Sequence, residues 1–188
     1  MTKWHGISIA LGLLAALALY AGHAAWALGA EMEGIDMQNI HHKLSTQYFN
    51  DCWTIIDKPD RSPDDVENML LLAYASLWHW KQRGDCKPLN LSVGYWQVSR
   101  VHALAGQYEM ARLFGEKCLK IGKDNKLPPF YLGYAYEALA RAEALHKDSG
   151  AARDCLAAAK EQLAEVKEKE DAELLRADLT DLEKSIPK

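Results

Sequence analysis

The stretch Asn90–Ile121, NLSVGYWQVSRVHALAGQYEMARLFGEKCLKI, predicts two antiparallel helices joined by a tight hinge. Before the hinge, Tyr95, Val98 and His102 recur at steps of three and four residues, which places them on one face of a helix. Gly106 suits the left-handed backbone that ends many helices, and the second helix starts directly after it. We therefore expect a helical hairpin at the centre of the chain.

The same residues resemble a tetratricopeptide repeat, a helical hairpin that stacks into arrays with a concave groove. Its characteristic slots are filled by Tyr95, Val98, Ser99, His102, Gly106, Tyr108, Ala111 and Cys118. A weaker copy follows after forty-one residues, with Lys147 where the first copy has Gly106. Because the usual repeat is about 34 residues long, the resemblance implies an irregular all-α array of about three helix pairs plus a C-terminal cap helix.

Three phrases of the sequence also resemble a group of small bacterial tetratricopeptide-like proteins with no assigned activity. They are YASLWHW (Tyr74–Trp80), NLSVGYWQVSRVHALAG (Asn90–Gly106) and FYLGYAYEALARA (Phe130–Ala142). This resemblance extends over roughly residues 40–183. It implies a fold and no reaction, so function has to be argued from individual residues.

Residues 1–30 predict a signal peptide or an N-terminal membrane anchor. Lys3 precedes an uncharged apolar run, and Ala25-Trp26-Ala27 offers a cleavage site. The run from Ile7 to Leu28 is also long enough to span a bilayer, so retention is the alternative to cleavage. In both cases the domain faces an extracytoplasmic space, either released into the periplasm or medium or tethered to the membrane. Residues 31–36 form a spacer, and residues 37–185 form the helical domain.

Two helix starts can be read from capping residues. Ser62 is expected to cap a helix that begins at Pro63, because proline fits the first helical position and a serine hydroxyl accepts a free backbone N–H. Asn90 is expected to cap the first helix of the central hairpin.

Composition limits the classes of partner. The chain of 188 residues is 49% hydrophobic and 26% charged, as in ordinary globular proteins, and its formal net charge is −4. A mildly acidic chain without a basic stripe is a poor nucleic-acid binder. Walker, GxGxxG, HExxH and GxSxG motifs are absent from the sequence, so we expect no cofactor.

Four cysteines, Cys52, Cys86, Cys118 and Cys155, show no zinc-finger spacing. One interpretation is that all four are small buried hydrophobic residues. The other is that an exported chain pairs Cys52 with Cys86, since Cys86 lies in a loop within reach of the first helix.

The resemblance implies which side chains face the groove. These positions are Val93, Trp96, Arg100 and Ala103 in the central copy, and Tyr134, Glu137, Arg141 and Ala144 in the next. An aromatic ring, two guanidinium groups and a carboxylate would then suit a partner's carboxylate or acidic side chain beside an apolar group. The alternative is structural: Arg100 pairs with Glu137 between neighbouring helices and Trp96 belongs to the core.

His79, between two tryptophans, supports a different class of function. Together with Arg100 and Glu137 it would make an enzyme or a small-ligand receptor, provided that the three side chains share one pocket. The alternative is a histidine in the core with a satisfied hydrogen bond. No set of ligands has convincing metal spacing, so we expect no metal site.

From Lys160 onward the chain is highly charged but keeps a stripe of leucines, Leu174, Leu175, Leu179 and Leu182. This is typical of a solvating cap helix on a repeat array. A self-associating structural protein of the envelope, joined through this helix, is the alternative. We expect a non-catalytic module that binds a protein or peptide partner. The sequence leaves its oligomeric state open.

Overall fold

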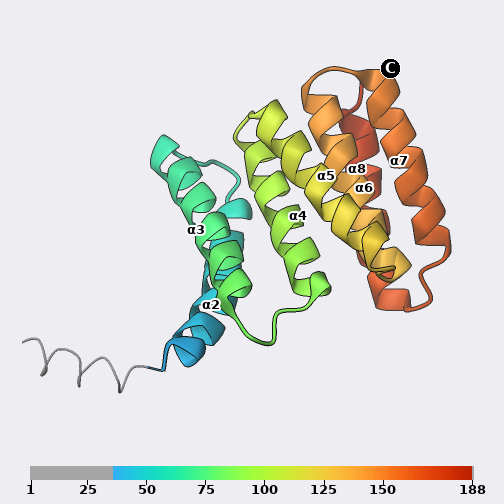
Figure 1. Cartoon of the computed structure of the whole chain (residues 1–188). Coiled ribbons are helices and arrows are strands. Elements are labelled where there is room, and N and C mark those ends of the chain that lie inside the picture. The colour runs from blue at the N-terminus through green and yellow to red at the C-terminus, as the bar shows by residue number, and fades with distance from the viewer. Residues whose placement is uncertain (1–35, 188) are drawn as a thin grey trace, which may run out of the picture. The chain divides into compact units, whose positions relative to one another are not determined.

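The computed structural model describes residues 36–187, and all its regular elements in that range are α-helices (Figure 1). They are α2 (Met37–Ile56), α3 (Pro63–Gln82), α4 (Pro88–Leu104), α5 (Tyr108–Asp124), α6 (Pro129–Leu145), α7 (Ser149–Ala164) and α8 (Lys169–Ser185). The predicted all-α class is confirmed. The predicted leader, residues 1–30, lies outside the described residues, as does nearly all of the spacer.

The described residues from Ile40 onward form one compact unit. Within residues 36–187, no helix combines the length and the apolar character needed to cross a membrane. The predicted membrane segment therefore remains an expectation about residues that the structure does not describe.

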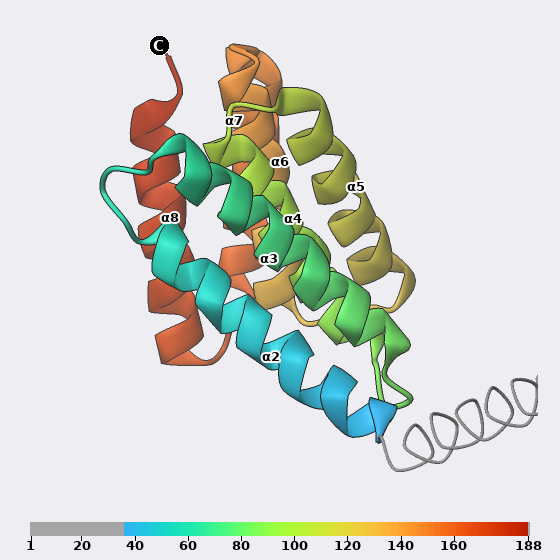
Figure 2. The same cartoon turned by 90° about the vertical axis from the view of Figure 1, so that its left-hand side faces the viewer.

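Successive helices of the compact unit run antiparallel (Figures 1 and 2). Hydrogen bonds join α2 to α3: Ser76 Oγ donates to Ser45 O at 2.7 Å, Cys52 Sγ donates to Met69 O at 3.4 Å, and the Nδ1 atoms of His41 and His79 lie 2.8 Å apart. Residue numbers rise along α2 as they fall along the facing part of α3, so the helices are antiparallel. In the next pair, Ser99 Oγ of α4 donates to Ala111 O of α5 at 2.7 Å, which marks the close crossing that the small Ala111 permits.

Three helices end in the same way, with one residue in the left-handed region. These residues are Gly106 (φ 74°), Lys126 (φ 51°) and Lys147 (φ 65°). Each is followed by a backbone N–H that reaches back five residues: Gln107 to His102, Leu127 to Gly122 and Asp148 to Glu143, at 2.9–3.1 Å. This is the Schellman pattern of helix termini. The predicted hinge at Gly106 is confirmed, and Lys147 adopts the backbone conformation of the glycine to which it corresponds.

One predicted cap is confirmed and the other is wrong. Ser62 caps α3: its Oγ accepts from Asp65 N at 3.1 Å, while the Asp65 carboxylate accepts from Ser62 N. Asn90, in contrast, is the third residue of α4. Its Oδ1 accepts from the backbone N–H of Lys87 at 2.9 Å, because α4 already begins at Pro88, whose fixed φ suits a first helical position.

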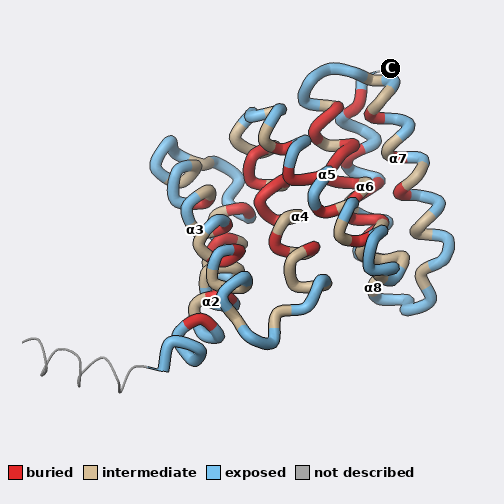
Figure 3. Tube along the Cα trace, viewed as in Figure 1, coloured by how far each residue is buried: buried red, intermediate tan, exposed pale blue. Residues whose placement is uncertain are grey.

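Two groups of buried side chains form the core. Buried residues are frequent along α4 and α6 (Figure 3). The first group joins α2, α3, α4 and α5 through Cys52, Ile56, Met69, Ala73, Leu77, Val98, Val101 and Phe114. The second joins α6, α7 and α8 through Tyr134, Ala140, Ala152, Leu156, Ala159, Leu175, Leu179, Leu182 and Ile186. Three leucines of the predicted stripe are thus buried, whereas Leu174 is 57% exposed. The C-terminal helix is therefore part of the core and does more than cover its end.

The predicted Cys52–Cys86 disulfide is wrong, since all four cysteines are free thiols. Cys52 faces Met69 in the first half of α3, whereas Cys86 follows the far end of that helix. The thirteen steps from Met69 to Gln82 extend about 20 Å along a helix. A disulfide requires the two Cα atoms to lie within about 7 Å of each other.

Candidate binding site

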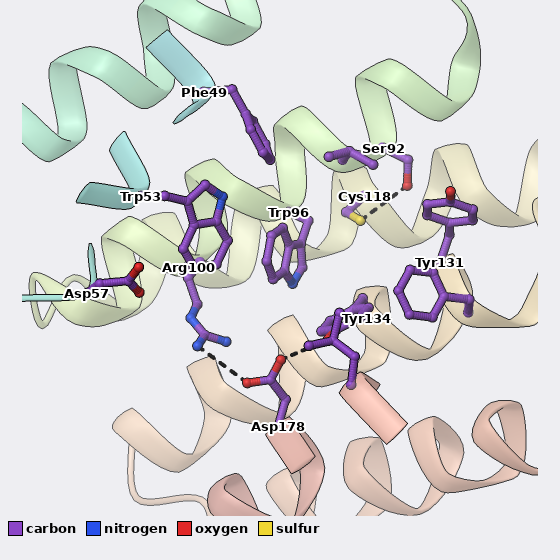
Figure 4. Close-up of a pocket in the computed structure, with 13 residues that line it drawn as sticks. Phe49, Trp53, Asp57, Ser92, Trp96, Arg100, Cys118, Tyr131, Tyr134 and Asp178 are labelled. Atoms are coloured by element: carbon purple, nitrogen blue, oxygen red, sulfur yellow. Dashed lines mark hydrogen bonds and ion pairs between the residues drawn. The ribbon is translucent and has the colours of Figure 1, made fainter. Parts of the chain in front are cut away.

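A cavity of about 470 Å³, called here the central cavity, opens between α2, α4, α6 and α8 (Figure 4). It is lined by Phe49, Trp53, Asp57, Ser92, Val93, Trp96, Arg100, Cys118, Phe130, Tyr131, Tyr134, Leu174 and Asp178. Its size falls in the range of about 300–1,000 Å³ found for ligand sites. Apart from Cys118 of α5, the lining comes from the first helix of each successive pair and from α8.

The walls of the central cavity are mainly aromatic and come from three helices. The ring of Trp96 on α4 lies 5.7 Å from that of Trp53 on α2 and 5.2 Å from that of Tyr134 on α6. Phe130 meets Tyr134 edge-on at 5.1 Å. Such rings give a large apolar contact area, and their faces also attract cations.

Behind this wall lies the fully buried carboxylate of Glu137. Its Oε1 accepts from Arg100 Nη1 at 3.1 Å and from Arg141 Nε and Nη2 at 2.8 and 2.5 Å. Its Oε2 accepts from the indole nitrogen of Trp96 at 3.2 Å. A buried carboxylate is tolerated only when charges and hydrogen bonds compensate it, so Glu137 is the internal counter-ion of two arginines.

Asp178 connects α8 to the same network. Its Oδ2 accepts from the Tyr134 hydroxyl at 2.8 Å, and its Oδ1 lies 3.6 Å from Arg100 Nη2 (Figure 4). Burial, together with the neighbouring Asp178 carboxylate, raises the pKa of the Tyr134 phenol well above its ordinary value. The phenol therefore stays protonated and donates to Asp178, which fixes this side of the cavity.

The structure brings the five predicted groove residues together, but in two roles. Trp96, Arg100 and Tyr134 line the central cavity, whereas Glu137 and Arg141 belong to the ion network behind it. The structural alternative, an Arg100–Glu137 pair between neighbouring helices, is present at 3.1 Å. Both guanidinium groups are neutralised within the protein, and the Arg100 side chain is only 15% exposed. The expectation that the guanidinium groups of Arg100 and Arg141 are available to an acidic ligand therefore does not agree with the structure.

His79 is not brought to this cavity. Its Nδ1 lies 2.8 Å from Nδ1 of His41 on α2, and its ring contacts Tyr48 and Trp78. Burial, and secondarily His41, lower the pKa of His79. The proposed constellation of His79, Arg100 and Glu137 is therefore not assembled. Among the described residues, no group of three acidic, histidine or cysteine side chains is arranged to hold a metal ion.

Several lining residues were not predicted as site residues, namely Phe49, Trp53 and Asp57 at α2 and Leu174 and Asp178 on α8. For Asp178 a signal was present: the forty-one-residue step that relates Trp96 to Glu137 reaches Asp178 when repeated. It was missed because the C-terminal helix was interpreted from its surface charge. Phe49 and Trp53 lie on the side of α2 that borders the cavity.

Two further cavities adjoin the central one. The first, about 260 Å³, shares Phe49, Val93 and Tyr131 with it and extends toward Trp80 and Asn90. The second, about 520 Å³, shares Phe130 and Tyr131 with the central cavity. It extends to residues 165–168 of the α7–α8 loop and to Asp171 at the start of α8. We call the three together the groove. Tyr131 borders all of them, so its side chain lies where the three cavities meet.

Comparisons with known proteins leave this geometry as the basis for any functional argument. No family model, curated protein or solved structure matches the chain. The aromatic walls, the neutralised ion network and the three adjoining cavities therefore carry the proposal that follows.

Proposed function

We propose that this chain is a tetratricopeptide-like binding module of the cell envelope, and that its groove holds an extended segment of a partner protein. The observation that carries the proposal is that three cavities adjoin one another at Tyr131. A compact small ligand would fill the central cavity alone. An extended peptide would place successive side chains in neighbouring cavities, as in other grooves that bind peptides.

The tetratricopeptide-like part of the proposal rests on three features that agree. Helices follow one another as antiparallel pairs, the central cavity is lined mainly by the first helix of each pair, and Gly106 and Lys147 end their helices alike. The location in the envelope rests on the predicted leader, residues 1–30.

The chemistry of the cavity favours binding over catalysis. Burial raises the pKa of the Cys118 thiol to about 12, so at neutral pH it is neither a nucleophile nor a base. The Tyr134 phenol is also held in its protonated form. Arg100 is engaged by Glu137 and Asp178. Cys118, Tyr134 and Arg100 are thus either held in their protonated form or committed to structural contacts.

Tyr131 provides a test that separates binding from folding. Peptides selected from a random displayed library against the full-length chain should bind about tenfold more weakly to Tyr131→Ala, the loss expected for one central aromatic contact. Tyr136→Ala is the matched control, since Tyr136 lies on the same helix, is likewise half-buried and borders none of the three cavities. Equal affinity for the two variants would contradict the proposal.

A further inference from the structure

The charges around the central cavity do not balance. Arg100 and Arg141 are matched by Glu137 and Asp178, to which they are linked directly or through each other. Asp57, which also lines the cavity, is exposed, and its carboxylate makes no ion pair or hydrogen bond with any described side chain. One negative charge of the cavity is therefore free to attract a ligand.

Asp57 is placed beside an aromatic face. Its backbone N–H donates to Trp53 O at 3.0 Å, one helical turn earlier, so the two side chains project on the same side of α2. Both line the central cavity, together with Trp96 (Figure 4). A carboxylate next to aromatic rings is a combination that suits a cation, because both the charge and the ring faces attract it.

The adjoining cavity at the α7–α8 loop also carries a net negative charge. It is lined by Glu165, Glu168 and Asp171 against a single basic residue, Lys167. A ligand that extends from the central cavity past Tyr131 thus enters a second region of net negative charge. The path from the central cavity to this second region is therefore complementary to a basic segment and opposes an acidic one, while the cavity of about 260 Å³ has no charged residue in its described lining.

We infer that the segment held in the groove is basic, with a lysine or arginine whose stem lies against Trp53 and Trp96 and whose cation faces Asp57. This inference rests on the proposed function and specifies its ligand. Long basic side chains suit such a site, since their methylene stems cover apolar surface while the charged group stays at its polar edge. A flanking apolar side chain fills the remainder of the aromatic cavity.

The test uses peptides with blocked ends, selected from a random heptapeptide library on the full-length chain. Each basic residue of a selected peptide is then replaced by norleucine, which keeps the stem and removes the charge, and by glutamate. We expect norleucine to weaken binding to the unmodified chain about three- to fivefold and glutamate to weaken it further. High salt should reduce these differences, because exposed charges are screened.

Two variants locate the effect. Asp57→Asn should abolish the preference for the basic residue, whereas Asp60→Asn, the same change on an exposed aspartate outside the cavities, should leave it intact. Peptides that depend on Tyr131 but bind equally well with norleucine or glutamate would overturn this inference while the proposed function stands. Failure to select any peptide that depends on Tyr131 would overturn the proposed function and the inference with it.

Discussion

The indole nitrogen of Trp96 on α4 donates to the buried carboxylate of Glu137 on α6 at 3.2 Å, and the two residues are forty-one positions apart in the chain. This bond joins the aromatic wall of the central cavity to the ion network behind it. The orientation of a binding surface is therefore fixed by residues that a ligand does not touch. It also means that a change at Glu137 acts on the stability of the fold and on the shape of the cavity together.

Glu137→Gln should lower the free energy of unfolding by about 3–5 kcal/mol, because it leaves Arg100 and Arg141 without their buried counter-ion. Glu161→Gln, on the exposed face of α7, is the control and should change stability by less than about 0.5 kcal/mol. Urea unfolding followed by circular dichroism measures both. Equal, small effects would show that the network does not hold α4 to α6.

Leu179→Ala should destabilise the protein by about 2–5 kcal/mol, since Leu179 is buried between α8 and the helices beneath it. Leu174→Ala, five residues earlier on the same helix, should cost far less because its side chain is 57% exposed. Thermal unfolding compares the two. A similar melting temperature for both variants would contradict a core role for α8, and removal of residues 170–188 should likewise unfold the chain.

Acidification should destabilise the fold. Burial lowers the pKa of His79 and of His102, so the unfolded chain binds more protons at these sites than the folded one. The stability that the neutral rings contribute is complete above about pH 6.5, the ordinary histidine value, and is lost as pH falls toward the lowered folded values. His79→Gln and His102→Gln should each flatten the fall in melting temperature between about pH 7 and pH 5. An unchanged slope in both variants would argue against the buried neutral rings.

The four thiols should differ in reactivity. Burial raises the pKa of Cys52 and of Cys118 to about 12, whereas Cys86 and Cys155 are half-buried. Because the thiolate is the reactive form, maleimide should label Cys86 and Cys155 first and the other two only on unfolding. Mass spectrometry of the labelled full-length chain follows this. Recovery of a Cys52–Cys86 disulfide peptide from the native protein would contradict the antiparallel arrangement of α2 and α3.

Local features of the chain could be predicted where the chemistry is local. Ser62, Pro63 and Gly106 act within one turn of their own positions, so their roles follow from backbone hydrogen bonding alone. The error at Asn90 has the same origin: two adjacent starts were chemically acceptable, and Pro88 took the first helical position.

Features that depend on how helices pack could be predicted only in part. The repeat correspondence brought Trp96 and Glu137 together correctly, since it carries one helix pair onto the next. It gave no position for Phe49 and Trp53, whose side of α2 depends on the angle between α2 and α4. The leucine stripe of α8 was visible in the sequence, but the contact of Asp178 with α4 and α6 was not, because pairing between helices is not visible in composition.

Fluorine NMR can show whether the groove, and no other surface, receives the partner segment. The six tryptophans, labelled with 5-fluorotryptophan and assigned by single Trp→Phe variants, give one resonance each. Titration with a selected basic peptide should shift the Trp53 and Trp96 resonances and leave that of Trp78, which is 54% exposed and borders none of the three cavities, unchanged. Saturable binding that shifts Trp78 but neither Trp53 nor Trp96 would contradict the account.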